Sequence, residues 1–213
     1  MNIRRLPVYF LLDTSGSMRG EPISSVNVAL QSMMAALRQD PHALESVYIS
    51  MITFDIEARE VLPLTSLEQS KIPEISTPKS GPTYLGAALE LLISRIDRDV
   101  KRNTAEAKGD WRPLVFIMTD GSPSDMQAFR GAVVEMKKRQ FGNIVACAAG
   151  PKAKQEYLKE ITDQVVLLDT MDSSSFSAFF KWITTSVSVG SSSAGISGPT
   201  VLPPPPSEIQ IVL

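Results

Sequence analysis

Apolar and polar positions along the chain fall into two alternating patterns. Residues 8–12 and 114–118 are continuous apolar runs of strand length, which is typical of parallel strands buried on both faces. After the first run, apolar side chains recur at three- and four-residue spacing, which predicts an amphipathic helix with Pro22 in its first turn. The apolar positions of this helix are Ile23, Val26, Leu30, Met33, Met34 and Leu37.

The same alternation continues to about residue 185. Further strands are predicted at residues 47–54, 60–62, 144–149 and 165–168, and further helices at 85–96, 129–136, 157–161 and 176–183. Pro63 and its polar neighbours place residues 60–62 at a sheet edge. The pattern predicts a doubly wound α/β fold: a mostly parallel six-stranded sheet with helices on both faces and one short antiparallel edge strand.

The composition changes at residue 188. Serines, glycines and the proline run 203–206 dominate from there, which predicts one domain at 1–187 and a flexible tail at 188–213. Two other roles for the tail stay open. The prolines could present an extended polyproline surface, and the alternating residues 208–213 could add a strand to a sheet edge of this or another chain.

Bulk composition narrows the function classes. The 213 residues are 43% apolar and 21% charged, near the usual values for a globular domain. A net charge of −2 gives no basic footprint for nucleic acid, and no apolar run is long enough to span a membrane. Cys147 is the only cysteine, and the N-terminus lacks the features of a signal peptide. A cytoplasmic location is therefore expected.

Oxygen-bearing side chains gather at three places beside predicted strand ends or helix starts. Asp13, Ser15 and Ser17 follow the first strand, Thr83 precedes the second helix, and Asp120 follows the strand at 114–118. Ligands bind beyond the carboxyl ends of strands in open α/β sheets. Carboxylates and hydroxyls without histidine or cysteine suit Mg²⁺, Mn²⁺ or Ca²⁺. With only two acids, the ion would keep a coordination position free for an outside oxygen.

These five residues, in this order, resemble the metal-ion-dependent adhesion site (MIDAS) of von Willebrand factor A domains. The resemblance runs from about residue 6 to 185. It implies that Ser15, Ser17 and Thr83 are hydroxyl ligands, and that Asp13 and Asp120 reach one divalent cation, Mg²⁺ first, directly or through water. It also implies a protein-binding role in which an acidic or phosphorylated partner completes the metal's shell.

A narrower resemblance is to the TerY-type A-domain proteins of bacterial tellurite-resistance clusters. It rests on Arg-Leu-Pro-Val-Tyr at residues 5–9, Leu-Asp-Thr-Ser-Gly-Ser-Met at 12–18, Gly-Glu-Pro-Ile at 20–23 and Thr-Asp-Gly-Ser-Pro-Ser-Asp at 119–125. The family often has threonine where Ser124 stands. The resemblance implies a bacterial stress-response protein that works beside a protein kinase and a phosphatase.

Some of these residues also fit simpler roles, and the motif allows one other function. Thr83 could be only a helix N-cap, Asp125 is predicted to cap the helix that follows it, and Asp55 is predicted to be a solvated loop residue. No enzymatic activity is expected. The alternative is a metal-dependent hydrolase or phosphatase that uses Asp13, although Ser15 stands where such enzymes usually have a second acid.

Overall fold

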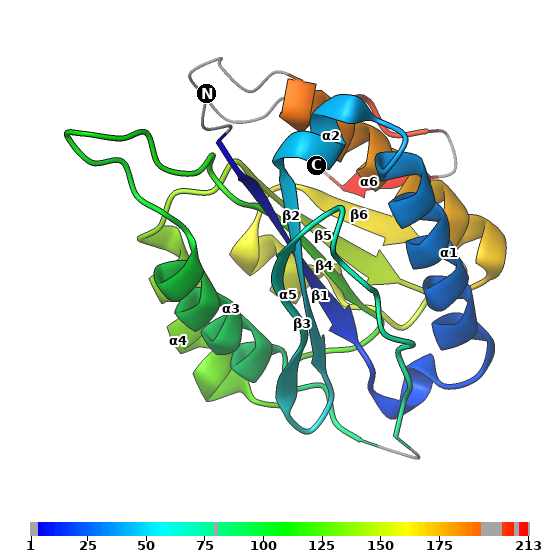
Figure 1. The fold of residues 1–213 in the computed structure, drawn as a ribbon. Helices are drawn as coiled ribbons and strands as arrows, with labels where there is room; N and C mark the ends of the chain where they lie inside the picture. The colour runs from blue at the N-terminus through cyan, green and yellow to red at the C-terminus, as the bar shows by residue number, and fades with distance from the viewer. Residues whose placement is uncertain (1–3, 79–80, 193–201, 207–208, 213) are drawn as a thin grey trace.

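The computed structural model describes residues 4–78, 81–192, 202–206 and 209–212. They form one seven-stranded sheet in the order β3-β2-β1-β4-β5-β6-β7, with helices on both faces (Figure 1). The strands are β1 (Leu6–Asp13), β2 (Val47–Phe54), β3 (Ala58–Ser66), β4 (Leu114–Thr119), β5 (Asn143–Ala149), β6 (Val165–Leu168) and β7 (Gln210–Val212). The helices are η1 (Gly16–Met18), α1 (Glu21–Leu37), α2 (Pro41–Ser46), α3 (Leu85–Asp99), α4 (Met126–Lys137), α5 (Gln155–Ile161) and α6 (Ser173–Ser192).

The predicted α/β class and its mostly parallel sheet are confirmed. β1 lies at the centre, parallel to both β2 and β4, and all eight of its residues are buried. β3 pairs antiparallel with β2 at one edge, as predicted, although it is longer than residues 60–62. Since β1, β2 and β4 are parallel, their carboxyl ends meet at one edge of the sheet.

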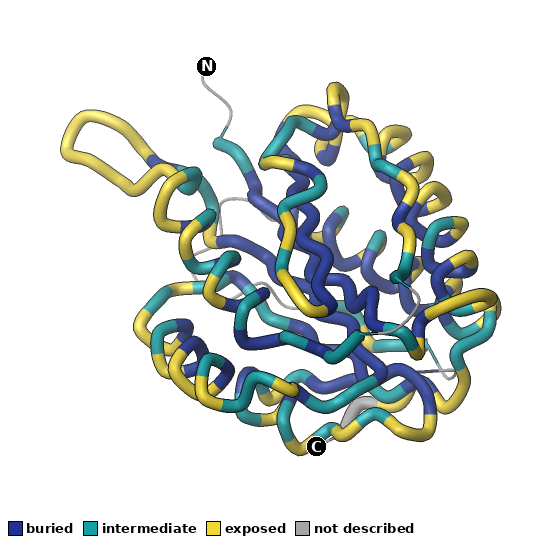
Figure 2. Tube along the Cα trace, turned by 90° about the horizontal axis from the view of Figure 1, so that it is seen from below, coloured by how far each residue is buried: buried dark blue, intermediate teal, exposed yellow. Residues whose placement is uncertain are grey.

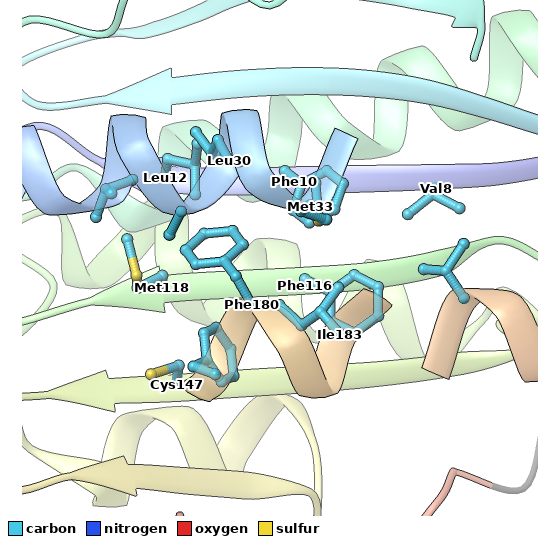
Figure 3. Close-up of a cluster of buried hydrophobic side chains, with 14 of the residues drawn as sticks. Val8, Phe10, Leu12, Leu30, Met33, Phe116, Met118, Cys147, Phe180 and Ile183 are labelled. Atoms are coloured by element: carbon cyan, nitrogen blue, oxygen red, sulfur yellow. The ribbon is translucent and has the colours of Figure 1, made fainter. Parts of the chain in front are cut away.

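Each face of the sheet has its own apolar core. On one face, Phe10 and Phe116 stack with ring centroids 5.4 Å apart, under Met33 of α1 and Phe180 and Ile183 of α6 (Figure 3). The opposite face packs against α3 and α4. Its core side chains include Tyr9, Leu89, Phe129 and Val133. Burial of each large apolar side chain contributes about 1.5–3 kcal/mol, so the two cores hold the sheet between its helices. The central strands are buried along most of their length, whereas the helices alternate between buried and exposed residues (Figure 2).

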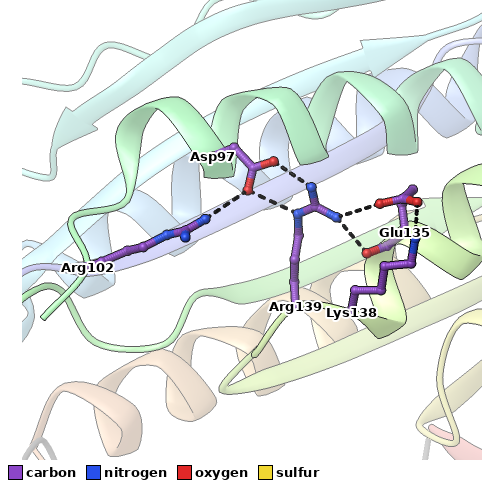
Figure 4. A network of polar contacts seen from close by, with 5 residues as sticks. All are labelled: Asp97, Arg102, Glu135, Lys138 and Arg139. Carbon is purple, nitrogen blue, oxygen red and sulfur yellow. Dashed lines mark hydrogen bonds and ion pairs between the residues drawn. The ribbon is translucent and has the colours of Figure 1, made fainter.

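An ion-pair network joins α3 to the end of α4. Arg139 donates to both oxygens of Asp97, at 3.1 and 2.5 Å, and also contacts Glu135 (Figure 4). Arg102 lies 3.8 Å from Asp97, and Lys138 pairs with Glu135. The network is at the surface, so it contributes little beside the apolar contacts between the same helices.

The C-terminal part differs from the prediction. α6 continues to Ser192, so the predicted boundary at 187/188 lies inside a helix. Residues 202–206 and 209–212 of the predicted flexible tail are placed on the domain: Trp182 Nε1 donates to Pro203 O at 2.9 Å, Ile209 is 4% exposed, and β7 pairs antiparallel with β6. The strand suggested for residues 208–213 therefore forms within this chain. The rest of the predicted tail, 193–201, 207–208 and 213, lies outside the described residues.

Within the described part of the chain, no helix has both the length and the apolar character needed to cross a membrane.

Candidate metal centre

The five candidate residues come together where β1 and β4 end. Leu12 of β1 is in register with Met118 of β4, so the loops after Asp13 and Thr119 start side by side. The loop that enters α3 reaches the same place, because Tyr84 N donates to Asp55 O at the end of β2. The tertiary fold therefore assembles three segments that are about 35 to 70 residues apart in the chain.

Asp13 is a fully buried carboxylate, with 0% of its surface exposed. Ser15 N donates to its Oδ1 at 2.7 Å, and Thr119 Oγ1 donates to its Oδ2 at 2.5 Å. Burial raises the pKa of Asp13 to about 6, with a further contribution from the charge of Asp120, while the hydrogen bonds from Thr119 and Ser15 oppose the rise. A cation next to this carboxylate would offset the cost of burying its charge.

Ser15, Ser17 and Asp120 form a short chain of oxygens. Ser15 Oγ and Ser17 Oγ are 3.3 Å apart, and Ser17 Oγ donates to Asp120 Oδ1 at 2.9 Å. The pKa of Asp120 is raised, because the effect of burial exceeds the opposing effects of the hydrogen bond from Ser17 and the charge of Lys152. Gly16 lies between the two serines at the start of η1, where the tight turn directs both hydroxyls to the same side.

Thr83 lies against Gly121, the residue after Asp120. A Cβ atom at Gly121 would be 3.0 Å from Thr83 Oγ1, so a larger residue there would press on the threonine hydroxyl. Two hydrogen bonds fix the Thr83 backbone: its N–H donates to Ser124 Oγ at 3.2 Å, and its carbonyl accepts from Ser124 N at 2.8 Å. Thr83 is not the N-cap of α3, a position that Tyr84 takes.

Asp125 caps a different helix from the one predicted. It occupies the N-cap position of α4, but its side chain makes no capping hydrogen bond there. Its carboxylate instead accepts from Gly86 N at 3.0 Å and Ala87 N at 2.8 Å, in the first turn of α3. The two helices touch closely here, because a Cβ at Gly86 would be 2.3 Å from Phe129 N. Asp125 thus ties the helix after Thr83 to the loop after Asp120.

Asp55 was predicted to be solvated, and that prediction is wrong. The residue is 3% exposed, and its Oδ2 accepts from Thr14 Oγ1 at 3.2 Å. Arg59 lies 3.8 Å from the same oxygen. Asp55 therefore supports the loop that carries Ser15 and Ser17. Its place directly after a buried parallel strand, at the ligand-binding edge of the sheet, was the available sequence signal.

A comparison with protein families finds that the von Willebrand factor type A domain matches residues 8–180. The chain belongs to this family. No curated protein sequence matches the A domain described here.

Solved structures share the fold of the A domain at low sequence identity. Proximal thread matrix protein 1 from the mussel byssus has a TM-score of 0.63 at 18% identity over 85% of this chain. The pilus adhesin SpaC from Lactobacillus rhamnosus GG has 0.67 at 13% over 89%, and the ArnB paralog VWA2 from Sulfolobus acidocaldarius has 0.59 at 13% over 87%. This chain covers 46%, 31% and 46% of those chains, under half of each. Another structure of the mussel protein has zinc in its MIDAS motif.

The oxygen donors of this A domain fit a hard divalent cation. Three of the five candidate ligands are hydroxyls and two are carboxylates. Softer metals prefer nitrogen and sulfur ligands, whereas Mg²⁺, Mn²⁺ and Ca²⁺ accept carboxylate, hydroxyl and water. Domains of this family typically bind a divalent cation at a MIDAS and mediate protein–protein interaction.

Proposed function

We propose that the A domain binds one Mg²⁺ ion and uses it to hold an acidic or phosphorylated partner protein. Ser15, Ser17 and Thr83 would contact the ion through their hydroxyls, and Asp13 and Asp120 directly or through water. An Asp, Glu or phosphoryl oxygen of the partner would take the coordination position that remains. Mn²⁺ and Ca²⁺ are the other candidate ions, since they accept the same ligands.

The observation that carries this proposal is the environment of Asp13. A fully buried carboxylate that lies within range of the charge of a second carboxylate, Asp120, is costly without a cation. The bond from Thr119 and the bond from the Ser15 backbone occupy one oxygen each. The two bonds fix the orientation of the Asp13 carboxylate, as hydrogen-bond partners behind the ligands of a metal site do.

We also propose that the domain is not an enzyme. A hydrolase that used Asp13 as nucleophile would need that carboxylate to reach a substrate, and the 0% exposure of Asp13 favours a supporting role instead. Turnover of a generic phosphate ester that disappears in Asp13→Ala would overturn this part of the proposal.

The resemblance to TerY-type proteins supports a setting for the interaction. We propose a cytoplasmic bacterial protein of a tellurite or general stress-resistance system, with a kinase or phosphatase of the same system as a candidate partner. The motifs at residues 12–18 and 119–125 carry this part of the proposal.

The test combines metal binding with partner capture. Calorimetry with MgCl₂ should show one site in the wild-type protein and none in Asp13→Ala or in Ser15→Ala combined with Ser17→Ala. Partners captured in Mg²⁺ should be lost in excess chelator and in Asp13→Ala. Asp40→Ala is the matched control, because Asp40 also hydrogen-bonds backbone N–H groups, at the start of α2 and away from the site. Equal capture in chelator would exclude the metal as the bridge.

A further inference from the structure

Two exposed side chains, one apolar and one cationic, flank the loops that follow Asp13 and Thr119 (the metal loops) along the sheet edge. The strand order β3-β2-β1-β4-β5 puts the turn between β2 and β3 on one side of these loops and the turn after β5 on the other. Neighbouring strands are about 4.8 Å apart, so the three steps from β2 to β5 span roughly 14 Å. The candidate metal centre, at the ends of β1 and β4, lies between the two turns.

Ile56 is the apolar member of this pair. It is 58% exposed at the tip of the turn after β2, so its side chain is free to contact a partner. The turn is held in place, because Asp55 N donates to Glu57 O at 3.1 Å and Tyr84 N donates to Asp55 O at 2.8 Å. The neighbouring Glu57 pairs with Arg59, which also lies 3.8 Å from Asp55, so the charges beside Ile56 are engaged with one another.

Lys152 is the cationic member. Gly150, with φ of +80°, turns the chain sharply after β5, and its N–H donates to Leu168 O at 2.8 Å. Met171 packs on this turn so closely that a Cβ at Gly150 would be 2.6 Å from its sulfur atom. In the register of β4 and β5, Thr119 is level with Ala148, so the turn after β5 begins beside the loop that carries Asp120.

Lys152 lies on the turn after β5, beside the loop that follows β4, and its charge is not neutralised elsewhere in the described part of the chain. Among the residues that the structure describes, Lys152 is exposed and forms no ion pair. A divalent ion balanced by Asp13 and Asp120 leaves this ammonium group as an excess positive charge, which suits a second anionic group on the partner.

We propose that the A domain recognises an extended partner segment through three contacts: a carboxylate on the metal, an apolar side chain on Ile56, and a second carboxylate on Lys152. An extended chain rises about 3.3 Å per residue, so the apolar residue and the second acid are expected roughly four residues apart, with the metal-binding acid between them. The proposal rests on the metal-dependent binding proposed above and specifies its partner.

Selection from a random peptide library tests the arrangement. The full chain is immobilised in MgCl₂, and bound peptides are eluted with chelator. The wild-type protein is expected to enrich an acid with an apolar residue on one side and a second acid on the other. The Lys152→Glu variant should enrich peptides that have Lys or Arg in place of the second acid and keep the metal-binding acid. The Ile56→Ser variant should lose only the preference for an apolar residue.

The control variants and the outcomes separate the two proposals. Lys108→Glu, in the exposed loop at the opposite end of the sheet, and Val134→Ser, 57% exposed on α4, should leave the enriched pattern unchanged. If chelator elutes no enriched peptides from the wild-type protein, the metal-dependent function itself is overturned. If enrichment depends on metal but Lys152→Glu and Ile56→Ser select the wild-type pattern, only the three-contact arrangement is overturned.

Discussion

Thr83 and Ser124 hold each other through a reciprocal pair of hydrogen bonds. Thr83 N donates to Ser124 Oγ at 3.2 Å, and Ser124 N donates to Thr83 O at 2.8 Å. The two residues are 41 positions apart and belong to different loops. The pair fixes the Thr83 backbone, whose side-chain hydroxyl lies against Gly121, so the geometry of the candidate metal centre depends on a residue that is not among its candidate ligands.

Replacement of Ser124 by alanine should weaken Mg²⁺ binding. The Thr83 N–H loses its acceptor, and a lost hydrogen bond of this kind costs about 1 kcal/mol of stability, so the loss in affinity should be at most roughly fivefold. Calorimetry with MgCl₂ measures the change. Ser124→Thr keeps the hydroxyl and should bind as the wild type does. An unchanged affinity in Ser124→Ala would show that Thr83 is positioned by other contacts.

Asp125→Ala should affect both stability and metal binding. The variant removes the acceptor for Gly86 N and Ala87 N, and loss of a helix cap typically costs about 1 kcal/mol. Because the start of α3 follows Thr83, we also expect weaker Mg²⁺ binding. Urea unfolding in chelator and calorimetry measure the two effects. Asp40→Ala, which removes a comparable cap from α2, should lower stability alone.

Asp13→Asn should stabilise the metal-free protein while abolishing its response to Mg²⁺. The folded pKa of about 6 lies above the ordinary 3.8, so the metal-free fold binds a proton more tightly than the unfolded chain and loses stability as pH rises through this window. At pH 7 the asparagine removes that cost, on the order of 2–3 kcal/mol. Thermal unfolding at pH 7 should show a higher Tm in chelator. A lower Tm in chelator would mean that the hydrogen bonds of Asp13 outweigh the cost of burying its charge.

Arg139→Ala tests the surface network between α3 and α4. Arg139 holds the pKa of Asp97 below its usual range by hydrogen bonding and by charge. The pair therefore stabilises the fold at pH values above the ordinary pKa of an aspartate. This stability is lost as the pH falls through the lower pKa of Asp97 in the folded state. We expect a loss below about 1 kcal/mol at pH 7 that shrinks in high salt, measured by urea unfolding. Mg²⁺ affinity should stay the same.

Ile209→Ser tests the placement of the C-terminal segment. Ile209 is 4% exposed and packs against the core that includes Trp182 of α6, so its replacement should cost about 1–3 kcal/mol in the free energy of unfolding. Gln210→Ser, at the exposed neighbouring position, is the control and should change stability little. Equal stability of the two variants would show that the segment does not stay on the domain in solution.

The strands, the longer helices and the candidate site could be predicted from the sequence because their signals are local. Continuous apolar runs mark buried parallel strands, and three- to four-residue spacing marks helices such as α1 and α3. Oxygen-bearing residues directly after strands point to the carboxyl edge of the sheet. The structure brings Asp13, Ser15, Ser17, Thr83 and Asp120 together there, and their role as metal ligands stays a prediction.

Local signals failed where the partner is distant in the chain. α6 carries Gly190 and Ser191, which suggest a linker by composition, yet both residues are buried in a helix that packs beside α1. The six-residue helix α2 is too short to show a period. β7 has only three residues, and it forms because the exposed edge of β6 supplies hydrogen-bonding partners that no neighbouring residue offers.

Residue type and spacing were enough to predict the alternation of strands and helices and the hard-oxygen chemistry of the candidate site. Three features became visible only in the folded chain: Asp125 caps α3, Asp55 is buried beneath the first loop, and the turns with Ile56 and Lys152 flank the candidate metal centre. Each of these features joins residues that are far apart in the chain. Such residues meet because of the strand order and the packing of the whole sheet, which no local sequence pattern contains.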